Sequence, residues 1–332
     1  MNNKQMKKVA IKAGIFGVLS ITVMLQRAAT KHILITDAAG THIDRKSTAD
    51  SYNILIDQNA SKGQVGKLII PLSKTVGSDD IVLEDRYIDH ELKIYIDSRE
   101  EGFYLENAII TDLNILKSAV CITENDSGSV CLDFVLNDLY ASSSSLTENS
   151  TIEVEFAKPS EMYDYTVVFD PAGAGDYDSA SAIDIALELK EIAAKDKENN
   201  LKIYFTGLGT EPASDERKSK LLKETAADLV IALNSRISDE QGSDIVSAYY
   251  NSQFFLRGMN NAEFADLTER SVATKIGAIA SGVYEADEDD VLLKEATVPA
   301  ARICVEYDNS SDDKKIAEGL YDAIIQALYT EE

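Results

Sequence analysis

A strand that ends in Asp-Pro and a turn of small residues is the first stretch of this sequence that could carry chemistry. Residues Thr166–Phe169 are β-prone, and Asp170, Pro171 and the run Ala-Gly-Ala-Gly at 172–175 follow them. A buried strand with such a turn typically delivers a loop to the carboxyl edge of an α/β sheet, where sites lie. We therefore expect a site at this loop. Asp170 would be its ionisable group, because residues 172–175 offer backbone groups and no side-chain ligand.

The sequence after residue 165 predicts the elements that would position this loop. Strands and helices alternate, which is typical of a mostly parallel sheet with helices on both faces. The expected strands are 166–170, 202–206, 228–233, 245–250 and 301–307, and the expected helices are 181–194, 215–225, 261–279 and 314–328. We therefore predict an α/β domain over residues 166–332.

The region before this domain has a different pattern. Short β-prone runs with turn residues between them indicate a small all-β sandwich over residues 51–157. The expected strands are Tyr52–Ile56, Lys67–Ile70, Leu92–Ile96, Ala108–Leu113, Ala119–Thr123, Ser129–Phe134 and Thr151–Phe156. The serine run Ser142–Ser145 is expected to be a loop, and residues 158–165 are expected to be a linker.

Residues 1–29 combine a lysine-rich start with an apolar run from Ala13 to Leu25. This pattern predicts one N-terminal hydrophobic helix, either an uncleaved signal anchor or a cleaved signal peptide, with contact to the cytoplasmic membrane through residues 9–29. The bulk of the chain would then lie outside the cytoplasm, joined to the membrane by a polar tether at 30–50.

An extracytoplasmic location allows disulfides. Cys121 and Cys131 flank a hairpin with Asn-Asp-Ser-Gly near its tip. Facing each other across two antiparallel strands, they could form a disulfide; two free thiols are the other interpretation. Cys304 follows Ile303 in an apolar run and is expected to be a small core residue.

The formal charge of −25 excludes a nucleic-acid partner recognised by electrostatics, since phosphate binding needs a basic surface. Residues 285–290, Glu-Ala-Asp-Glu-Asp-Asp, concentrate five acidic groups. Such a run is most often a solvated loop, and the other interpretation is a docking surface for a basic partner or a cation.

Several stretches of the second domain resemble the zinc-dependent N-acetylmuramoyl-L-alanine amidase family. Val167–Gly175 is similar to the family's strand ending in Asp-Pro-Gly-His-Gly-Gly, and Ala227–Ser235 is similar to its Ala-Asp-Leu strand ending in Ser-Ile-His-Ala-Asn. Glu216-Arg217, Val291-Leu292, Val298-Pro299-Ala300, Val305-Glu306 and Ile316–Leu320 match further family motifs in the same order. The β region resembles the N-terminal (AMIN) domain found upstream of such enzymes.

The resemblance implies a zinc held by two histidines and a glutamate, with a further glutamate that acts on the metal-bound water. Position by position, the histidines fall on Gly173 and Asn234, the ligand glutamate falls near Asp178 or Ser179, and the catalytic glutamate falls on Glu306. The only histidines of the chain are His32, His42 and His90. No zinc and no other cofactor is therefore expected at this site.

Oxygen groups remain at these positions, and they suit a hard cation such as calcium or magnesium better than zinc. They are Asp170, Asp176, Asp178, Asn234 and Glu306. The alternative interpretation is a set of solvated carboxylates at strand ends. Glu306 ranks first as a vestige of catalysis, while Asp170, Asn234 and Asp176 are the residues expected to contact a substrate or partner.

Two functions from different classes follow from the resemblance. The first is a membrane-tethered, non-catalytic amidase-like protein that binds peptidoglycan or an envelope protein. The second is an active amidase that hydrolyses the bond between muramic acid and L-alanine with a non-standard metal held by Asp170, Asp178 and Glu306. A purely structural envelope subunit is a third possibility.

Overall fold

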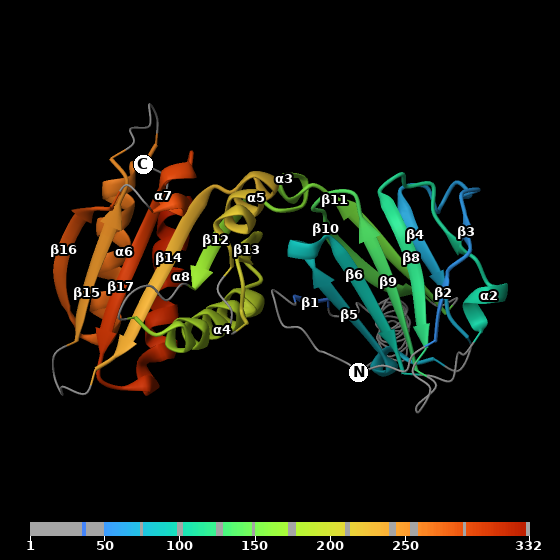
Figure 1. The fold of residues 1–332 in the computed structure, drawn as a ribbon, viewed down its shortest axis with the longest axis horizontal. Coiled ribbons are helices and arrows are strands. Elements are labelled where there is room, and N and C mark those ends of the chain that lie inside the picture. The colour runs from blue at the N-terminus through green and yellow to red at the C-terminus, as the bar shows by residue number, and fades with distance from the viewer. Residues whose placement is uncertain are drawn as a thin grey trace, which may run out of the picture.

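The computed structural model describes residues 35–37 and 50–329, except for 74–75, 98–101, 124–128, 148–149, 172–176, 210–212, 239–243, 253–257 and 288–289. Across these residues the chain forms three β-sheets and seven α-helices. Figure 1 shows how these elements are arranged. The buried side chains form two large hydrophobic cores. We call residues 35–37 and 50–157 the N-terminal unit and residues 165–329 the C-terminal unit.

Two sheets of the N-terminal unit share one hydrophobic core. The first has the order β1 (Ile35–Asp37), β5 (Ile81–Arg86), β6 (Glu91–Ile96), β9 (Val130–Leu136), β8 (Leu116–Thr123) and β2 (Asp50–Asn53). The second has the order β10 (Ala141–Thr147), β11 (Thr151–Ala157), β4 (Lys67–Pro71), β7 (Ile109–Ile110) and β3 (Ile56–Asp57). A short helix, α2 (Phe103–Glu106), precedes β7. In β6 every second side chain is buried in the core, as expected for a strand with one solvated face.

Three strands of these sheets were not predicted, and the loop predicted for Ser142–Ser145 is wrong. The serines Ser142–Ser145, expected to form a loop, lie in β10, which pairs with β11 from Ala141 opposite Ala157 to Thr147 opposite Thr151. Strand β10 is the edge strand of its sheet, where Ser143 is exposed and Ser144 is buried. Strand β5 was also missed. Strand β1 lies inside the segment 30–50 that was expected to be a tether.

The disulfide considered for the β8–β9 hairpin is not present, and neither Cys121 nor Cys131 is bridged to another cysteine. In the β8–β9 register, Cys121 lies opposite Leu132, and Cys131 lies opposite Ile122. The two cysteines are therefore one position out of register, and their side chains point to opposite faces of the sheet. Cys121 is buried in the shared core, while Cys131 is buried on the other face.

The C-terminal unit has a six-stranded, mostly parallel sheet. Its order is β13 (Leu201–Phe205), β12 (Tyr165–Pro171), β14 (Leu229–Ile237), β17 (Ala300–Tyr307), β15 (Ile245–Tyr250) and β16 (Ile279–Glu285). Only the β15–β17 pair is antiparallel. Strands β12 and β14 are buried along most of their length, because helices cover both faces of the sheet.

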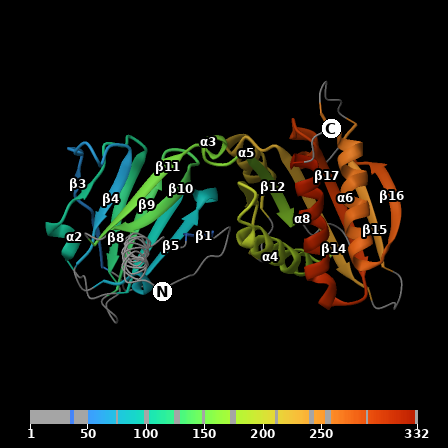
Figure 2. The same cartoon turned by 180° about the vertical axis from the view of Figure 1, so that it is seen from behind.

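Three long helices form a layer on one face of this sheet: α4 (Ser179–Lys195), α6 (Asn261–Ile276) and α8 (Asp313–Tyr329) (Figure 2). Ser181 of α4 lies on this side, where its hydroxyl bonds with those of Ser235 and Tyr307. The shorter helices α5 (Asp215–Thr225) and α7 (Val291–Glu295) lie on the opposite face, which carries Asp170 and Asn234. The prediction of helices on both faces is therefore confirmed.

Local signals set the ends of these helices. Side chains of Asp178, Ser214 and Asn260 accept hydrogen bonds from backbone N–H groups in the first turns of α4, α5 and α6. Helix α5 and strand β15 have the predicted bounds. The helix predicted to reach residue 279 is wrong at its end, because Gly277 takes a left-handed conformation with φ +73° and stops α6 at Ile276. The unpredicted strand β16 follows.

Helices α6 and α8 approach each other closely at Gly319. A Cβ atom at this position would lie 2.8 Å from the Cα of Val272. The hydroxyl of Ser271 donates a hydrogen bond to the Gly319 carbonyl over 2.7 Å. The absence of a side chain at residue 319 therefore lets the two helices pack backbone to backbone.

A turn of the N-terminal unit contacts the edge of the C-terminal sheet. The Tyr87 hydroxyl accepts a hydrogen bond from the Phe205 N–H over 2.7 Å and donates one to the Phe205 carbonyl over 2.9 Å. Arg217 pairs with Asp89 over 2.9 Å. The segment expected to be a linker contains one helical turn, α3 (Pro159–Met162). The two units thus meet through specific polar contacts as well as through the chain.

Within the part of the chain that the structure describes, no helix is both long and apolar enough to cross a bilayer. The hydrophobic helix predicted within residues 1–29 lies outside the described residues.

Candidate functional site

Polar side chains gather on the face of the C-terminal sheet that carries α5 and α7. The strand register places Asp170 opposite Ala232 and Ala232 opposite Arg302, and one step further Asn234 lies opposite Cys304. Arg236 and Glu306 form the next row. Residues opposite each other in a sheet share a face, so three predicted site residues, Asp170, Asn234 and Glu306, lie on one surface.

Asp170 lies at the end of β12, where its carboxylate is buried with its partners. Lys218 of α5 places its Nζ 2.7 Å from Oδ2, and the Thr206 hydroxyl donates to Oδ1. Only 3% of the Asp170 side chain and 12% of the Lys218 side chain are exposed. The strand end thus carries a neutralised ion pair rather than a free carboxylate.

Asn234, near the end of β14, is bound by Arg302 of β17. The guanidinium Nη1 donates to the Asn234 Oδ1 over 3.1 Å, and its Nε donates to the Asp290 Oδ2 over 2.6 Å. Asp290 also caps α7 by accepting a bond from the Leu293 N–H. The expectation that residues 285–290 form a solvated loop is therefore wrong for Asp290, whose side chain is only 10% exposed.

Cys304 is buried, as predicted, but it faces this polar surface. Burial raises the pKa of its thiol above its ordinary value, although the neighbouring Tyr177, Arg302 and Asn234 act in the opposite direction. Burial also raises the pKa of the Tyr177 hydroxyl, and the nearby Cys304 adds to this effect. Both groups stay protonated at neutral pH, so neither is an activated nucleophile.

Glu306 is the most open of the three predicted residues. Its carboxylate pairs with Arg236 of β14 over 2.7 Å, and 31% of its side chain is exposed. The Arg236 guanidinium also lies over the Tyr177 ring, 5.8 Å from the ring centre. Glu306 therefore lies at the solvent-exposed end of the row, opposite a cation.

The loop between β12 and α4 is only partly described. Asp178 is exposed and acts as the N-cap of α4, accepting a hydrogen bond from the Ala180 N–H over 2.9 Å. Its own N–H donates to the Ser235 carbonyl. Gly173 and Asp176 lie outside the described residues, so their place at the site stays a prediction.

This face therefore presents fixed and mutually neutralised charges. Asp170, Asp290 and Glu306 each pair with a cation of the same chain: Lys218, Arg302 and Arg236. Each of these carboxylates already uses an oxygen for a cation of its own chain, which leaves fewer oxygen lone pairs free to contact a substrate.

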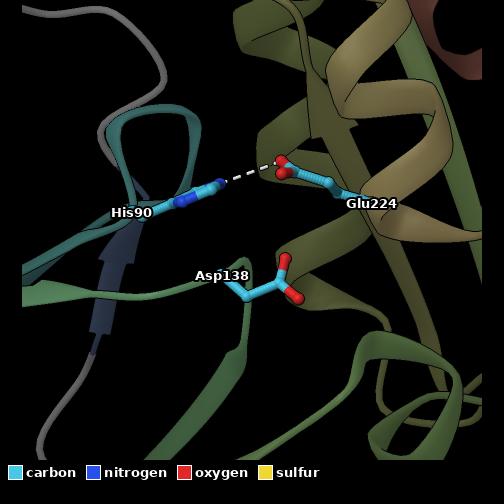
Figure 3. A group of neighbouring side chains, drawn as sticks. All are labelled: His90, Asp138 and Glu224. Carbon is cyan, nitrogen blue, oxygen red and sulfur yellow. Dashed lines mark hydrogen bonds and ion pairs between the residues drawn. The ribbon is translucent and has the colours of Figure 1, made fainter. Parts of the chain in front are cut away.

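A second polar cluster, missed in the sequence, lies where the two units meet. His90 follows the β5–β6 turn, Asp138 follows β9, and Glu224 lies in the last turn of α5 (Figure 3). The three residues are far apart in the chain and belong to no common motif. The C-terminal unit alone does not contain the cluster, because His90 and Asp138 come from the N-terminal unit.

No protein-family model and no curated protein sequence matches this chain. Solved structures similar to it include the catalytic domain of CwlV, an N-acetylmuramoyl-L-alanine amidase from Bacillus (Paenibacillus) polymyxa var. colistinus, at 15% identity and a TM-score of 0.42, over 50% of this chain and 99% of that chain. An N-acetylmuramoyl-L-alanine amidase from Clostridium difficile 630 matches at 17% identity and a TM-score of 0.43, over 51% of this chain and 98% of that chain.

The CwlD amidase from Clostridioides difficile, solved in complex with the GerS lipoprotein, matches at 12% identity and a TM-score of 0.42. The match spans 50% of this chain and 100% of that chain. Likeness at this level assigns neither an activity nor a partner. A function for this chain therefore has to be inferred from its own side chains.

Proposed function

We propose that this protein is an amidase-like binding protein of the bacterial envelope, tethered to the cytoplasmic membrane by its N-terminal segment, that does not hydrolyse peptidoglycan. It would bind peptidoglycan or an envelope protein through the polar face of the C-terminal sheet. The proposal combines the resemblance of residues 166–328 to the amidases with the contacts made by the residues at the ligand positions.

The observation that carries the proposal is the contact between Arg302 and Asn234. By resemblance, Asn234 occupies the place of a zinc-binding histidine, and its amide oxygen accepts a hydrogen bond from the Arg302 guanidinium at 3.1 Å. A divalent cation at this oxygen would lie against a fixed positive charge. Such a pair repels strongly in a partly buried environment.

The other described residues at these positions fit zinc no better. Asp178 caps α4, and Glu306 is paired with Arg236. The same pairing argues against the hard cation considered for the oxygen groups, because Asp170 already holds the ammonium of Lys218. A site of this kind supports retention of the fold for binding rather than for metal-dependent hydrolysis.

Purified sacculi test the proposal. The full-length chain should sediment with sacculi or with an envelope protein attached to them, and it should release no free peptide stems. Glu306→Gln should weaken this binding several-fold, because it removes a charge from the most open part of the face. Glu295→Gln serves as the matched control, because Glu295 pairs with Lys223 between α7 and α5 and does not belong to the row of Asp170, Asn234 and Glu306.

The active amidase is the opposing outcome. Release of peptide stems by the natural chain, abolished by Glu306→Gln, would overturn the non-catalytic proposal and establish the hydrolase. The release of free peptide stems is the deciding measurement. Zinc content alone does not decide between the two functions, because zinc bound at another site would also be counted.

A further inference from the structure

We propose that His90, Asp138 and Glu224 bind a divalent transition-metal ion of the zinc class at the junction of the two units. His90 and Asp138 come from the N-terminal unit, and Glu224 comes from α5 of the C-terminal unit (Figure 3). This site is separate from the polar sheet face, and it does not depend on the proposed binding function.

The geometry of the three side chains is close to that of a metal site. One nitrogen or oxygen of each residue lies within 4.8 Å of the others, and the His90 Nε2 is 2.9 Å from the Glu224 Oε2. Ligand atoms around a tetrahedral zinc ion lie about 3.4 Å from one another, given metal–ligand distances of about 2.0–2.2 Å. The site therefore needs side-chain shifts of about 1 Å or less at each ligand and no rearrangement of the backbone.

The backbone around the cluster is held in place before any ion binds. The His90 carbonyl accepts a hydrogen bond from Leu136 N–H over 2.7 Å, and the Leu139 N–H donates to the Asp138 Oδ1 over 2.8 Å. On the other side, Tyr87 and Asp89 are fixed to β13 and α5 by the contacts described above. A preorganised set of ligands loses less entropy on binding than a flexible one.

Charge and burial favour a cation at this place. The His90 side chain is only 9% exposed, and that of Glu224 is 20% exposed. One oxygen of each carboxylate lies within 4.8 Å of an imidazole nitrogen. Their present cations are Lys158, 2.5 Å from Asp138, and Lys220, 3.8 Å from Glu224, and these lysine side chains are 41% and 51% exposed. Both lysines can turn toward solvent when a divalent ion takes their place.

The ligand types select the class of metal. An imidazole suits zinc, cobalt and similar ions, whereas magnesium and calcium prefer sites made only of oxygen. Three protein ligands leave one position for water or for a group from a partner. An ion held in this way would join the two units directly, since it is bound from both sides of the junction.

A background that carries His32→Gln and His42→Gln makes the test specific, because His90 is then the only histidine of the chain. The full-length protein, without a histidine tag, is titrated with Zn²⁺, with Co²⁺ and with Mg²⁺ as the negative control. We expect one Zn²⁺ per chain, a visible Co²⁺ absorption band, and a shift of the single imidazole signal in the NMR spectrum.

Variants of the cluster then assign the ligands. His90→Gln and Glu224→Gln should each weaken Zn²⁺ binding by about tenfold or more, the loss typical even for residues that only support a ligand. Lys158→Met should strengthen binding several-fold, because it removes the ammonium that competes for Asp138. Glu295→Gln, on a neighbouring ion pair of α5, should leave the affinity unchanged.

Two results would overturn the site. One is an imidazole signal that does not respond to Zn²⁺ in the background protein. The other is Zn²⁺ binding that His90→Gln leaves unaltered. Circular dichroism of each variant checks its fold, and Lys158→Met together with the NMR titration decides the question even if a ligand variant fails to fold.

Discussion

Arg302 joins three elements of the polar sheet face through one planar side chain. Its Nε and Nη1 donate to Asp290 at the start of α7 and to Asn234 of β14, while its backbone belongs to β17. Burial alone would lower its pKa, but the hydrogen bond and charge of Asp290 outweigh burial, and the pKa of Arg302 is raised. The guanidinium is therefore a permanent charge whose partners depend on it.

Removal of this guanidinium should destabilise the protein more than its size suggests. Arg302→Met leaves the Asp290 carboxylate buried without a cation and leaves the Asn234 oxygen without its donor. We expect a loss of about 3 kcal/mol in the free energy of unfolding, as found for broken buried ion pairs. Urea denaturation monitored by circular dichroism measures this loss.

Arg236→Met is the matched control on the same face. The Arg236–Glu306 pair is more exposed, with 38% and 31% of the two side chains accessible. An exposed pair contributes about 0–1 kcal/mol. Equal losses in the two variants would contradict the structural role of the Arg302 network.

At the residue scale, the sequence predicted where the site residues lie better than it predicted which side chains they contact. Asp170 was singled out because it ends an apolar run, and Glu306 because the resemblance places the catalytic glutamate there; both lie on one face of the sheet. Arg302 was not singled out, since a single arginine within a strand has no motif around it. The His90 cluster depends on how the two units meet, and nothing local to residue 90 encodes that arrangement.

Among the elements, the α6–α8 pair shows how one small residue fixes a packing distance. The Cα of Val272 leaves no room for a Cβ at residue 319, and the Ser271 hydroxyl bonds to the carbonyl exposed by this close approach. Gly319 thus sets the distance between the two helices.

Gly319→Ala should destabilise the C-terminal unit, although alanine ordinarily stabilises a helix relative to glycine. The added methyl group would push α8 away from α6, and overpacking of this kind costs about 1–3 kcal/mol. Thermal unfolding should show a lower melting temperature for this variant.

Gly207→Ala is the control for that substitution, because a Cβ at residue 207 would have no heavy atom within 4 Å. Its effect on the melting temperature should be small. A Gly319 variant as stable as the natural protein would show that the helices can separate without loss.

At the element scale, helices and strands with strong local signals in the sequence were predicted, and those with weak signals were missed. Helix α5 was predicted with its observed bounds, and local features fix both ends: the Ser214 side chain caps its first turn, and Ala226 after its last turn takes a left-handed conformation. Strand β16 was missed because the helical pattern before it continues past Gly277. Strand β10 was missed because edge strands tolerate serines, so the composition of Ser142–Ser145 indicated a loop.

On the scale of the whole molecule, Tyr87 completes an edge that would otherwise be open. Strand β13 is the last strand of its sheet, and the Tyr87 hydroxyl pairs with both backbone groups of Phe205. The Tyr87 ring also packs edge-on against Tyr204, with ring centres 5.0 Å apart. The N-terminal unit thus satisfies hydrogen bonds that belong to the C-terminal sheet.

Tyr87→Phe should loosen the junction while it keeps the aromatic packing. The loss of the hydroxyl leaves the Phe205 N–H and carbonyl buried without partners, at a cost of about 1–3 kcal/mol. We expect a lower midpoint in urea and faster proteolysis within residues 158–164, which connect the two units.

Tyr284→Phe provides the comparison, since the Tyr284 hydroxyl bonds only to an exposed carbonyl, that of Ser281. That variant should unfold like the natural protein. If Tyr87→Phe also behaved like the natural protein, water would be replacing the hydroxyl, and the junction would not depend on it.

The contact of Tyr87 with β13 also decides how this protein can be divided for experiments. A fragment that begins after the linker would present the outer edge of β13 to solvent, with the Phe205 backbone groups ready to pair with the same strand of another copy. Its behaviour in solution would then report self-association of a newly exposed strand. The two halves are therefore best studied together, even where a question concerns only one of them.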